Sequence, residues 1–169
     1  MFYTETMTTI REYNSKDLPW LEKSMEIFQD GLIESDLEKM LYRSEDYGKQ
    51  YTAHALKRVV EEQGVCYIAE QGGSHVGFIM GIVHKVEGVE AFENNEEQYG
   101  EVIELYVEEA FRGTGLADEL MKKLEVYLKE KHCNQIYIEV FAPNEQARKF
   151  YEKCEYHVRD YVMMKKLNQ

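Results

Sequence analysis

The sequence predicts a fold of the α/β (α+β) class, in which a mixed sheet carries helices on both faces. Segments with strand-like alternation are interleaved with amphipathic helical segments along the chain. Residues 65–83 indicate an antiparallel hairpin, whereas residues 101–141 indicate two parallel strands joined by a helix. Because one sheet would hold both kinds of pairing, we expect a mixed sheet of six or seven strands.

The length and composition favour one globular domain. The chain has 169 residues, so we expect a single domain over residues 1–169. A hydrophobic content of 44% excludes disorder, and the longest apolar run, residues 76–83, is far shorter than the roughly 20 residues that cross a bilayer. The N-terminus lacks the basic and apolar regions of a signal peptide. We therefore expect a soluble, cytoplasmic protein with no membrane partner.

The N-terminal third is expected to hold a strand followed by helices. Residues 8–13 alternate as a strand does, and Ser15 or Asp17 would cap a helix that Pro19 begins. Two further helices are expected at residues 32–42 and 51–62, where apolar side chains recur at helical spacing.

A hairpin and a long loop are expected next. Strands at residues 65–70 and 76–83 are separated by Gln71-Gly-Gly-Ser, whose glycines can take the positive φ of a tight hairpin turn. Residues 87–97 are polar and acidic without a clear period, so we expect a long mobile loop there.

The C-terminal half indicates a β-α-β unit. A strand at residues 101–107 leads into a helix at 116–131, where leucines recur at helical spacing, and a parallel strand follows at 135–141. Asn144 is a good cap for a last helix, and residues 156–167 would add one or two strands.

A glycine-containing turn joins the strand at residues 101–107 to its helix. Gly113 and Gly115 have no Cβ, so the backbone can approach a ligand closely, and the following helix presents unpaired N–H groups and its positive dipole end. This arrangement predicts an anion site. It is neither a Walker loop nor a dinucleotide fingerprint, because Leu116-Ala-Asp118 stands where those patterns need Lys with Ser/Thr or a third glycine.

Two motifs together resemble the GNAT superfamily of N-acetyltransferases. Arg112-x-x-Gly115-x-Ala117 is similar to the family's acyl-CoA pyrophosphate loop, and Asn144-Glu-Gln-Ala-Arg-Lys-Phe-Tyr151 is similar to its downstream Asn-x-x-Ala-x-x-Phe-Tyr helix. Either motif alone would be weak, whereas both occur here in the family's order and spacing. The resemblance implies a GNAT-like three-layer fold, acetyl-CoA as the cofactor and acetyl transfer to a primary amine.

The resemblance also assigns residues to the cofactor. It implies that the pantetheine arm pairs like an added strand with residues 105–107, and that the glycine turn binds the pyrophosphate. The cofactor-binding residues it implies are Leu105, Tyr106, Val107, Arg112, Gly113, Thr114, Gly115, Leu116, Ala117 and Asn144.

Three residues are candidates for proton transfer. An alkyl ammonium has a pKa of about 10 and cannot attack while protonated, so a carboxylate must take its proton. Glu101 matches the position where several family members carry a glutamate base, and we prefer it. Glu104 is the alternative: it alternates onto the opposite face of a regular strand, and a bulge would exchange the two. The base could also come from the N-terminal helices, or bulk solvent could deprotonate the amine.

Tyr151 is the candidate acid. The resemblance implies that Tyr151 lies by the CoA sulfur and can protonate it. The alternative is that Tyr151 is an aromatic residue of the core with no catalytic role.

The charge distribution favours a cationic acceptor. Of the net charge of −12, residues 1–100 carry 19 acidic and 9 basic side chains. Such a field repels nucleic acid and anionic lipid and attracts cations, unless these carboxylates are only a solvated surface. The sequence therefore favours a polyamine- or aminoglycoside-like small molecule. A protein or peptide N-acetyltransferase, or a non-catalytic acyl-CoA-binding regulatory module, is the alternative.

No metal centre is expected. The three cysteines have no C-x-x-C spacing and the five histidines no i, i+4 pairing, so we predict reduced thiols and structural histidines. Dimers are frequent in the family that the chain resembles, so the resemblance admits a homodimer.

Overall fold

A five-stranded mixed sheet forms the centre of the larger of two compact units. The computed structural model describes residues 7–167, and the units divide between Glu139 and Val140. The sheet has the order β1-β2-β3-β4-β5, so the predicted six or seven strands exceed the five that the described residues form. The strands are β1 (Thr8–Glu12), β2 (Val65–Gln71), β3 (Ser74–Lys85), β4 (Gln98–Val107) and β5 (Ile136–Ile138).

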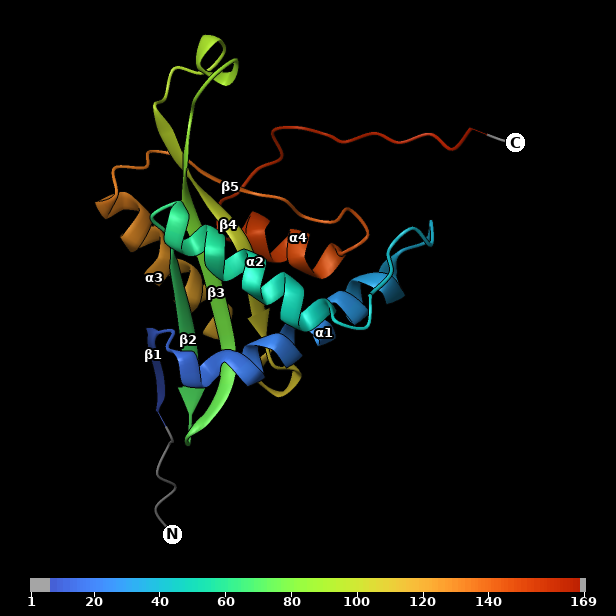
Figure 1. Cartoon of the computed structure of the whole chain (residues 1–169), viewed down its shortest axis with the longest axis vertical. Coiled ribbons are helices and arrows are strands. Elements are labelled where there is room, and N and C mark those ends of the chain that lie inside the picture. The colour runs from blue at the N-terminus through green and yellow to red at the C-terminus, as the bar shows by residue number, and fades with distance from the viewer. Residues whose placement is uncertain (1–6, 168–169) are drawn as a thin grey trace. The chain divides into compact units, whose positions relative to one another are not determined.

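The pairing confirms the mixed sheet. The first four strands pair antiparallel, and β5 pairs parallel with β4. The β2–β3 turn forms where the sequence predicts it, because Gly72 and Gly73 both take positive φ, at 59° and 81°. Between β3 and β4, the connection carries one short 3-10 turn, η2 (Glu90–Phe92), beyond the end of the sheet (Figure 1).

Helices cover both faces of the sheet. Figure 1 shows α1 (Leu18–Ser35) and α2 (Tyr47–Glu61) across one face and α3 (Leu116–Glu130) behind the other. On the first face, buried side chains of α1, α2 and the central strands form one cluster that includes Leu21, Met25 and Phe78. Among the described helices, none is long and apolar enough to cross a membrane.

Three glycines bring α3 close to the second face. A Cβ at Gly81 would lie 2.6 Å from Leu124 Cδ1, and one at Gly100 would lie 2.6 Å from Leu128 Cδ1. On Gly77, a Cβ would lie 3.4 Å from Leu120 Cδ1. The leucines that predicted this helix therefore pack into the positions that larger side chains would occupy.

The helix expected at residues 32–42 does not form. Instead α1 ends at Ser35, and the Asp36 carboxylate accepts hydrogen bonds from the backbone N–H groups of Glu38, Met40 and Leu41. Because these donors are satisfied by a side chain, the segment needs no helical ladder, and α2 begins only at Tyr47.

The first helix is also capped differently from the prediction. Asp17 occupies the N-cap position of α1 but makes no side-chain cap. With Asn14 it forms the capping box of the short turn η1 (Ser15–Asp17).

The second unit contains one helix, α4 (Glu145–Lys153). Asn144 caps it as predicted, because its side-chain oxygen accepts the N–H of Ala147 at 3.1 Å. The strands expected at residues 156–167 do not form, and Tyr161, Val162 and Met163 are exposed. Alternation alone does not make a strand, which also needs a pairing partner. The strand expected at 135–141 is limited to the three residues of β5.

Candidate active site

Strand β4 has an open backbone edge in its second half. It pairs with β3 as far as Val107, but its pairing with β5 ends at Val102. In the described part of the chain, no strand continues the sheet beside residues 103–107. Alternate N–H and C=O groups of this stretch can therefore pair with an extended ligand.

A bulge in β4 places both candidate bases toward α2. Met80 of β3 pairs with Glu104 and the next residue, Gly81, pairs with Val102, so Ile103 is the extra residue. Glu101 and Glu104 consequently both contact side chains of α2. We expected a bulge to exchange the positions of the two glutamates, but this bulge brings both onto one face of β4.

Glu101 is held in an ion pair. Its carboxylate lies 3.0 Å from an Arg58 nitrogen, and Arg58 also binds Glu62, the C-cap residue of α2, at 2.8 Å. The Glu101 side chain is 30% exposed. The Glu101 carboxylate is therefore already occupied by a cation from α2.

Glu104 has a different environment. Its side chain is buried, with 7% of the residue exposed, and it accepts a hydrogen bond from the Tyr51 hydroxyl. Burial raises the pKa of Glu104 to about 7, and the Tyr51 hydrogen bond opposes part of that rise. A carboxyl that titrates near neutrality is suited to general acid–base work.

The glycine turn has the geometry of an anion cradle. Gly113 and Gly115 take φ values of 76° and 94°, and no atom lies within 4 Å of where their Cβ atoms would be. Gly115 is the N-cap of α3 and has no side chain, so it leaves the first N–H groups of the helix without a side-chain cap. These residues therefore fit the diphosphate of CoA.

The side chains around the turn support its shape. Arg112 donates from Nε to the carbonyl of Val107 at 3.0 Å, and Thr114 Oγ1 donates to the carbonyl of Phe111 at 2.7 Å. Leu116 is buried at the start of α3, which fixes the helix end to the core. The turn is thus tied to the end of β4.

Replacing Gly115 by Val should weaken acetyl-CoA binding at least about tenfold, because a β-branched side chain disfavours positive φ and covers the N–H groups. Gly73→Val is the matched control, since Gly73 also has positive φ and open space around it but lies in the β2–β3 turn. Calorimetry should give a weakened affinity for Gly115→Val only. Equal affinities in the two variants would remove the turn from the cofactor site.

In the second unit, α4 carries the other two predicted residues. Tyr151 is buried, with its ring edge-on to Phe150 at 5.1 Å and to Tyr156 at 5.8 Å between centroids. Asn144 uses its side-chain oxygen for the helix cap, so its amide NH₂ is the group left to donate.

The sequence motifs do not point to Tyr51 or Arg58. Both lie on α2, seven residues apart, and therefore on one face of the helix. The sequence pattern that could have indicated them is that both side chains, each with a polar end, lie at helical spacing from the apolar residues Ala55 and Leu56. The contacts of this face of α2 with Glu101 and Glu104 depend on the bulge in β4, and the sequence of α2 does not indicate them.

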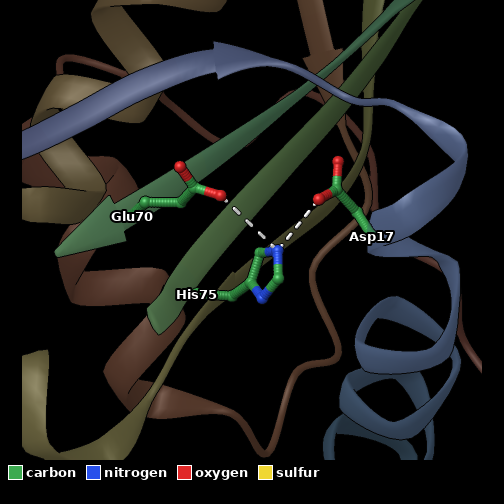
Figure 2. A group of neighbouring side chains, drawn as sticks. All are labelled: Asp17, Glu70 and His75. Carbon is green, nitrogen blue, oxygen red and sulfur yellow. Dashed lines mark hydrogen bonds and ion pairs between the residues drawn. The ribbon is translucent and has the colours of Figure 1, made fainter. Parts of the chain in front are cut away.

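A second charged cluster joins η1, β2 and β3. Asp17, Glu70 and His75 converge from η1, β2 and β3 (Figure 2), with donor atoms within 4.8 Å of one another. Arg11 binds both oxygens of Asp17, at 2.7 and 2.8 Å, and also Glu70. The guanidinium therefore already supplies the positive charge that a metal ion would bring, and it holds the pKa of Asp17 well below the ordinary range.

Two solved structures of acetyltransferases share this fold. A structure described as a predicted acetyltransferase with acetyl-CoA, from Clostridium acetobutylicum, has a TM-score of 0.72 at 20% identity, with 96% of each chain covered. An aminoglycoside 6′-N-acetyltransferase from Acinetobacter haemolyticus has a TM-score of 0.66 at 15% identity, covering 95% of this chain and 99% of the other.

The family follows from the sequence match. Residues 20–156 match the model of the acetyltransferase (GNAT) family, and the chain belongs to that family. An uncharacterised N-acetyltransferase of Methanocaldococcus jannaschii is 34% identical over 94 residues, which are 55% of this chain and 53% of the relative. The chain thus spans about half the length of this curated relative. Acetyl-CoA is the cofactor that goes with the family.

Proposed function

We propose that the protein transfers an acetyl group from acetyl-CoA to a primary amine of a cationic small molecule, with Glu104 as the base and Tyr151 as the acid. The observation that carries the proposal is the position of Glu104. A buried carboxyl with a pKa of about 7 lies within the open half of β4, directly before Leu105–Val107. A buried carboxyl beside the open strand edge favours an enzyme over a binding module without chemistry.

Each part of the chain has a defined task in this reaction. The turn at Gly113–Gly115 and the end of α3 bind the diphosphate, and the open edge of β4 aligns the pantetheine arm. When bound, acetyl-CoA supplies an acyl group activated as a thioester. A backbone N–H of residues 105–107 donates to the carbonyl oxygen, an effect worth about 3 kcal/mol in comparable sites.

Proton transfer involves two residues. The Glu104 carboxylate takes a proton from the acceptor ammonium, directly or through one water, which frees the nitrogen lone pair for attack. Tyr151 Oη gives a proton to the sulfur as the carbon–sulfur bond breaks. The nitrogen loses its second proton as the amide forms, and solvent returns a proton to the Tyr151 phenolate. We prefer Glu104 to Glu101 because Glu101 is engaged by Arg58, whereas the described residues provide Glu104 with one hydroxyl partner and no cation.

The choice of acceptor is supported by charge. The 19 acidic side chains of residues 1–100 outnumber the 9 basic ones, and these residues include α1, α2 and the connection before β4. One structural neighbour acts on aminoglycosides, which are polycationic amines. We expect the same class of acceptor here, bound on the side of β4 that faces α2.

The test is release of free thiol from acetyl-CoA in a panel of amines. A diamine should react with a kcat/KM at least about tenfold above that of the monoamine of equal chain length, because the second charge is drawn by the acidic field. The advantage should shrink as salt is raised, since screening limits the field to about 8 Å at physiological ionic strength.

Other outcomes would identify other functions. A preference for anionic amino acids, or an advantage that salt leaves unchanged, would contradict the cationic acceptor. Turnover of peptides in place of small amines would make the protein a peptide acetyltransferase. Calorimetric binding of acetyl-CoA with no thiol release from any amine or peptide would indicate a regulatory module.

A further inference from the structure

We infer that Tyr51 is a positioning residue for the acetyl transfer: its hydroxyl holds Glu104 through one oxygen, keeps that carboxylate charged and leaves the second oxygen for the acceptor ammonium. This inference rests on the proposed function, because it takes Glu104 as the base. It adds a residue outside both sequence motifs and gives α2 a chemical role.

The hydrogen bond defines which oxygen is available. Tyr51 donates to Oε1 of Glu104, and no described residue donates a hydrogen bond to the second oxygen, Oε2. A phenol is a donor at neutral pH, and burial together with the Glu104 charge raises the pKa of Tyr51 far above its usual value. Tyr51 therefore stays protonated and cannot replace Glu104 as the base.

The Tyr51 ring is itself held in place. It stacks on Tyr47, one helical turn earlier, with centroids 5.1 Å apart and planes 9° from parallel. Tyr47 donates to Gln29 Oε1 of α1 at 3.2 Å, and Gln29 donates from Nε2 to the carbonyl of Tyr42 at 3.1 Å. The hydroxyl that meets Glu104 is thus fixed from both helices on that face of the sheet.

The surrounding charges explain why a hydroxyl is needed. From α2, the groups near Glu104 are the Tyr47 and Tyr51 hydroxyls and the Arg58 guanidinium; from β4, the neighbouring charged group is Glu101. Arg58 is committed to Glu62 and Glu101. The hydrogen bond from Tyr51 is therefore the direct stabilisation of the Glu104 charge among the described residues, and it opposes the effect of burial.

The variant Tyr51→Phe removes the donor and keeps the ring stacked on Tyr47. Loss of a hydrogen bond to a charged group should raise the pKa of Glu104 by about one to two units. Tyr47→Phe is the matched control, because it removes a stacked hydroxyl from the same helix that bonds Gln29 instead. It should move the Glu104 titration by less than half as much.

The measurement is a carbon-13 carboxyl titration of the full chain by NMR, with Glu104 identified by the signal that Glu104→Gln removes. An upward shift in Tyr51→Phe alone supports the inference. No shift, or equal shifts in both variants, overturns it. Because this reading needs no acceptor, it decides the Tyr51 contact even if the proposed reaction proves wrong.

Kinetics then test the role in catalysis. The rising limb of kcat/KM against pH should move upward with the Glu104 titration, so that Tyr51→Phe loses about tenfold at neutral pH and recovers at high pH. A merely structural role would lower the rate at every pH. If the titration moves and the kinetic limb does not, Glu104 is not the base and the positioning role fails.

Discussion

Replacing Glu104 by Gln should lower kcat/KM by about 10² to 10⁴, the contribution of a well-placed general base. Gln keeps the shape and can still accept the Tyr51 hydroxyl, so the loss isolates proton transfer. In the native protein, kcat/KM should rise with pH and level off above about 7, because the base must be deprotonated. The variant should lack that limb. Steady-state kinetics with the best amine from pH 5 to 9 would measure both effects.

The same substitution should make the fold more stable at neutral pH. Glu104 has a pKa of about 7 in the folded state against an ordinary 4.5, so the folded protein binds the extra proton and stability falls as pH rises through that interval. Removing the charge should recover up to about 3 kcal/mol at pH 8 and almost nothing at pH 4. Urea unfolding at the two pH values would show the difference.

Glu101→Gln is the matched control for both measurements. It lies on the same face of β4, but its carboxylate pairs with Arg58 and is partly exposed. We expect less than about 1 kcal/mol of stability change and a smaller kinetic effect. If Glu101→Gln is instead the inactive variant, the base is the residue that the family position favoured, and Glu104 serves the fold.

Tyr151→Phe should lower kcat by about 10 to 10⁴ while leaving acetyl-CoA affinity nearly unchanged, because only a proton donor is lost. Tyr156→Phe is the control, since its ring contacts Tyr151 in the same unit but lies outside the family motif. Single-turnover thiol release would separate chemistry from product release. A full rate in Tyr151→Phe, or an equal loss in both variants, would reassign Tyr151 to packing.

Sequence patterns predicted those parts of the fold that depend on local chemistry. The β2–β3 turn, the leucine row of α3 and the Asn144 cap each follow from a few adjacent residues. Gly113 and Gly115 were predicted to use their lack of a Cβ, and both take positive φ in the structure.

The rest depended on pairing between distant segments. The Ile103 bulge is a property of two strands together, so Glu101 and Glu104 could not be assigned to a face from β4 alone. Asp36 looked like an ordinary helix residue, yet its carboxylate ends α1 by satisfying three backbone donors. The contact of Tyr51 with Glu104 depends on the bulge, because the bulge brings Glu104 toward α2.

Three glycines, Gly77, Gly81 and Gly100, determine how closely α3 packs on the sheet. Leu120, Leu124 and Leu128 lie where these residues lack a Cβ, so the distance between helix and sheet is set by the absence of three methyl groups. The glycine turn at the head of α3 is carried by that helix, whereas the open edge belongs to the sheet. A residue with a Cβ at Gly81 or Gly100 would clash with a leucine of α3 and move the helix away from the sheet. The distance between the glycine turn and the open edge of β4 would then change, so the two could no longer bind the same cofactor, although the residues of neither had been substituted.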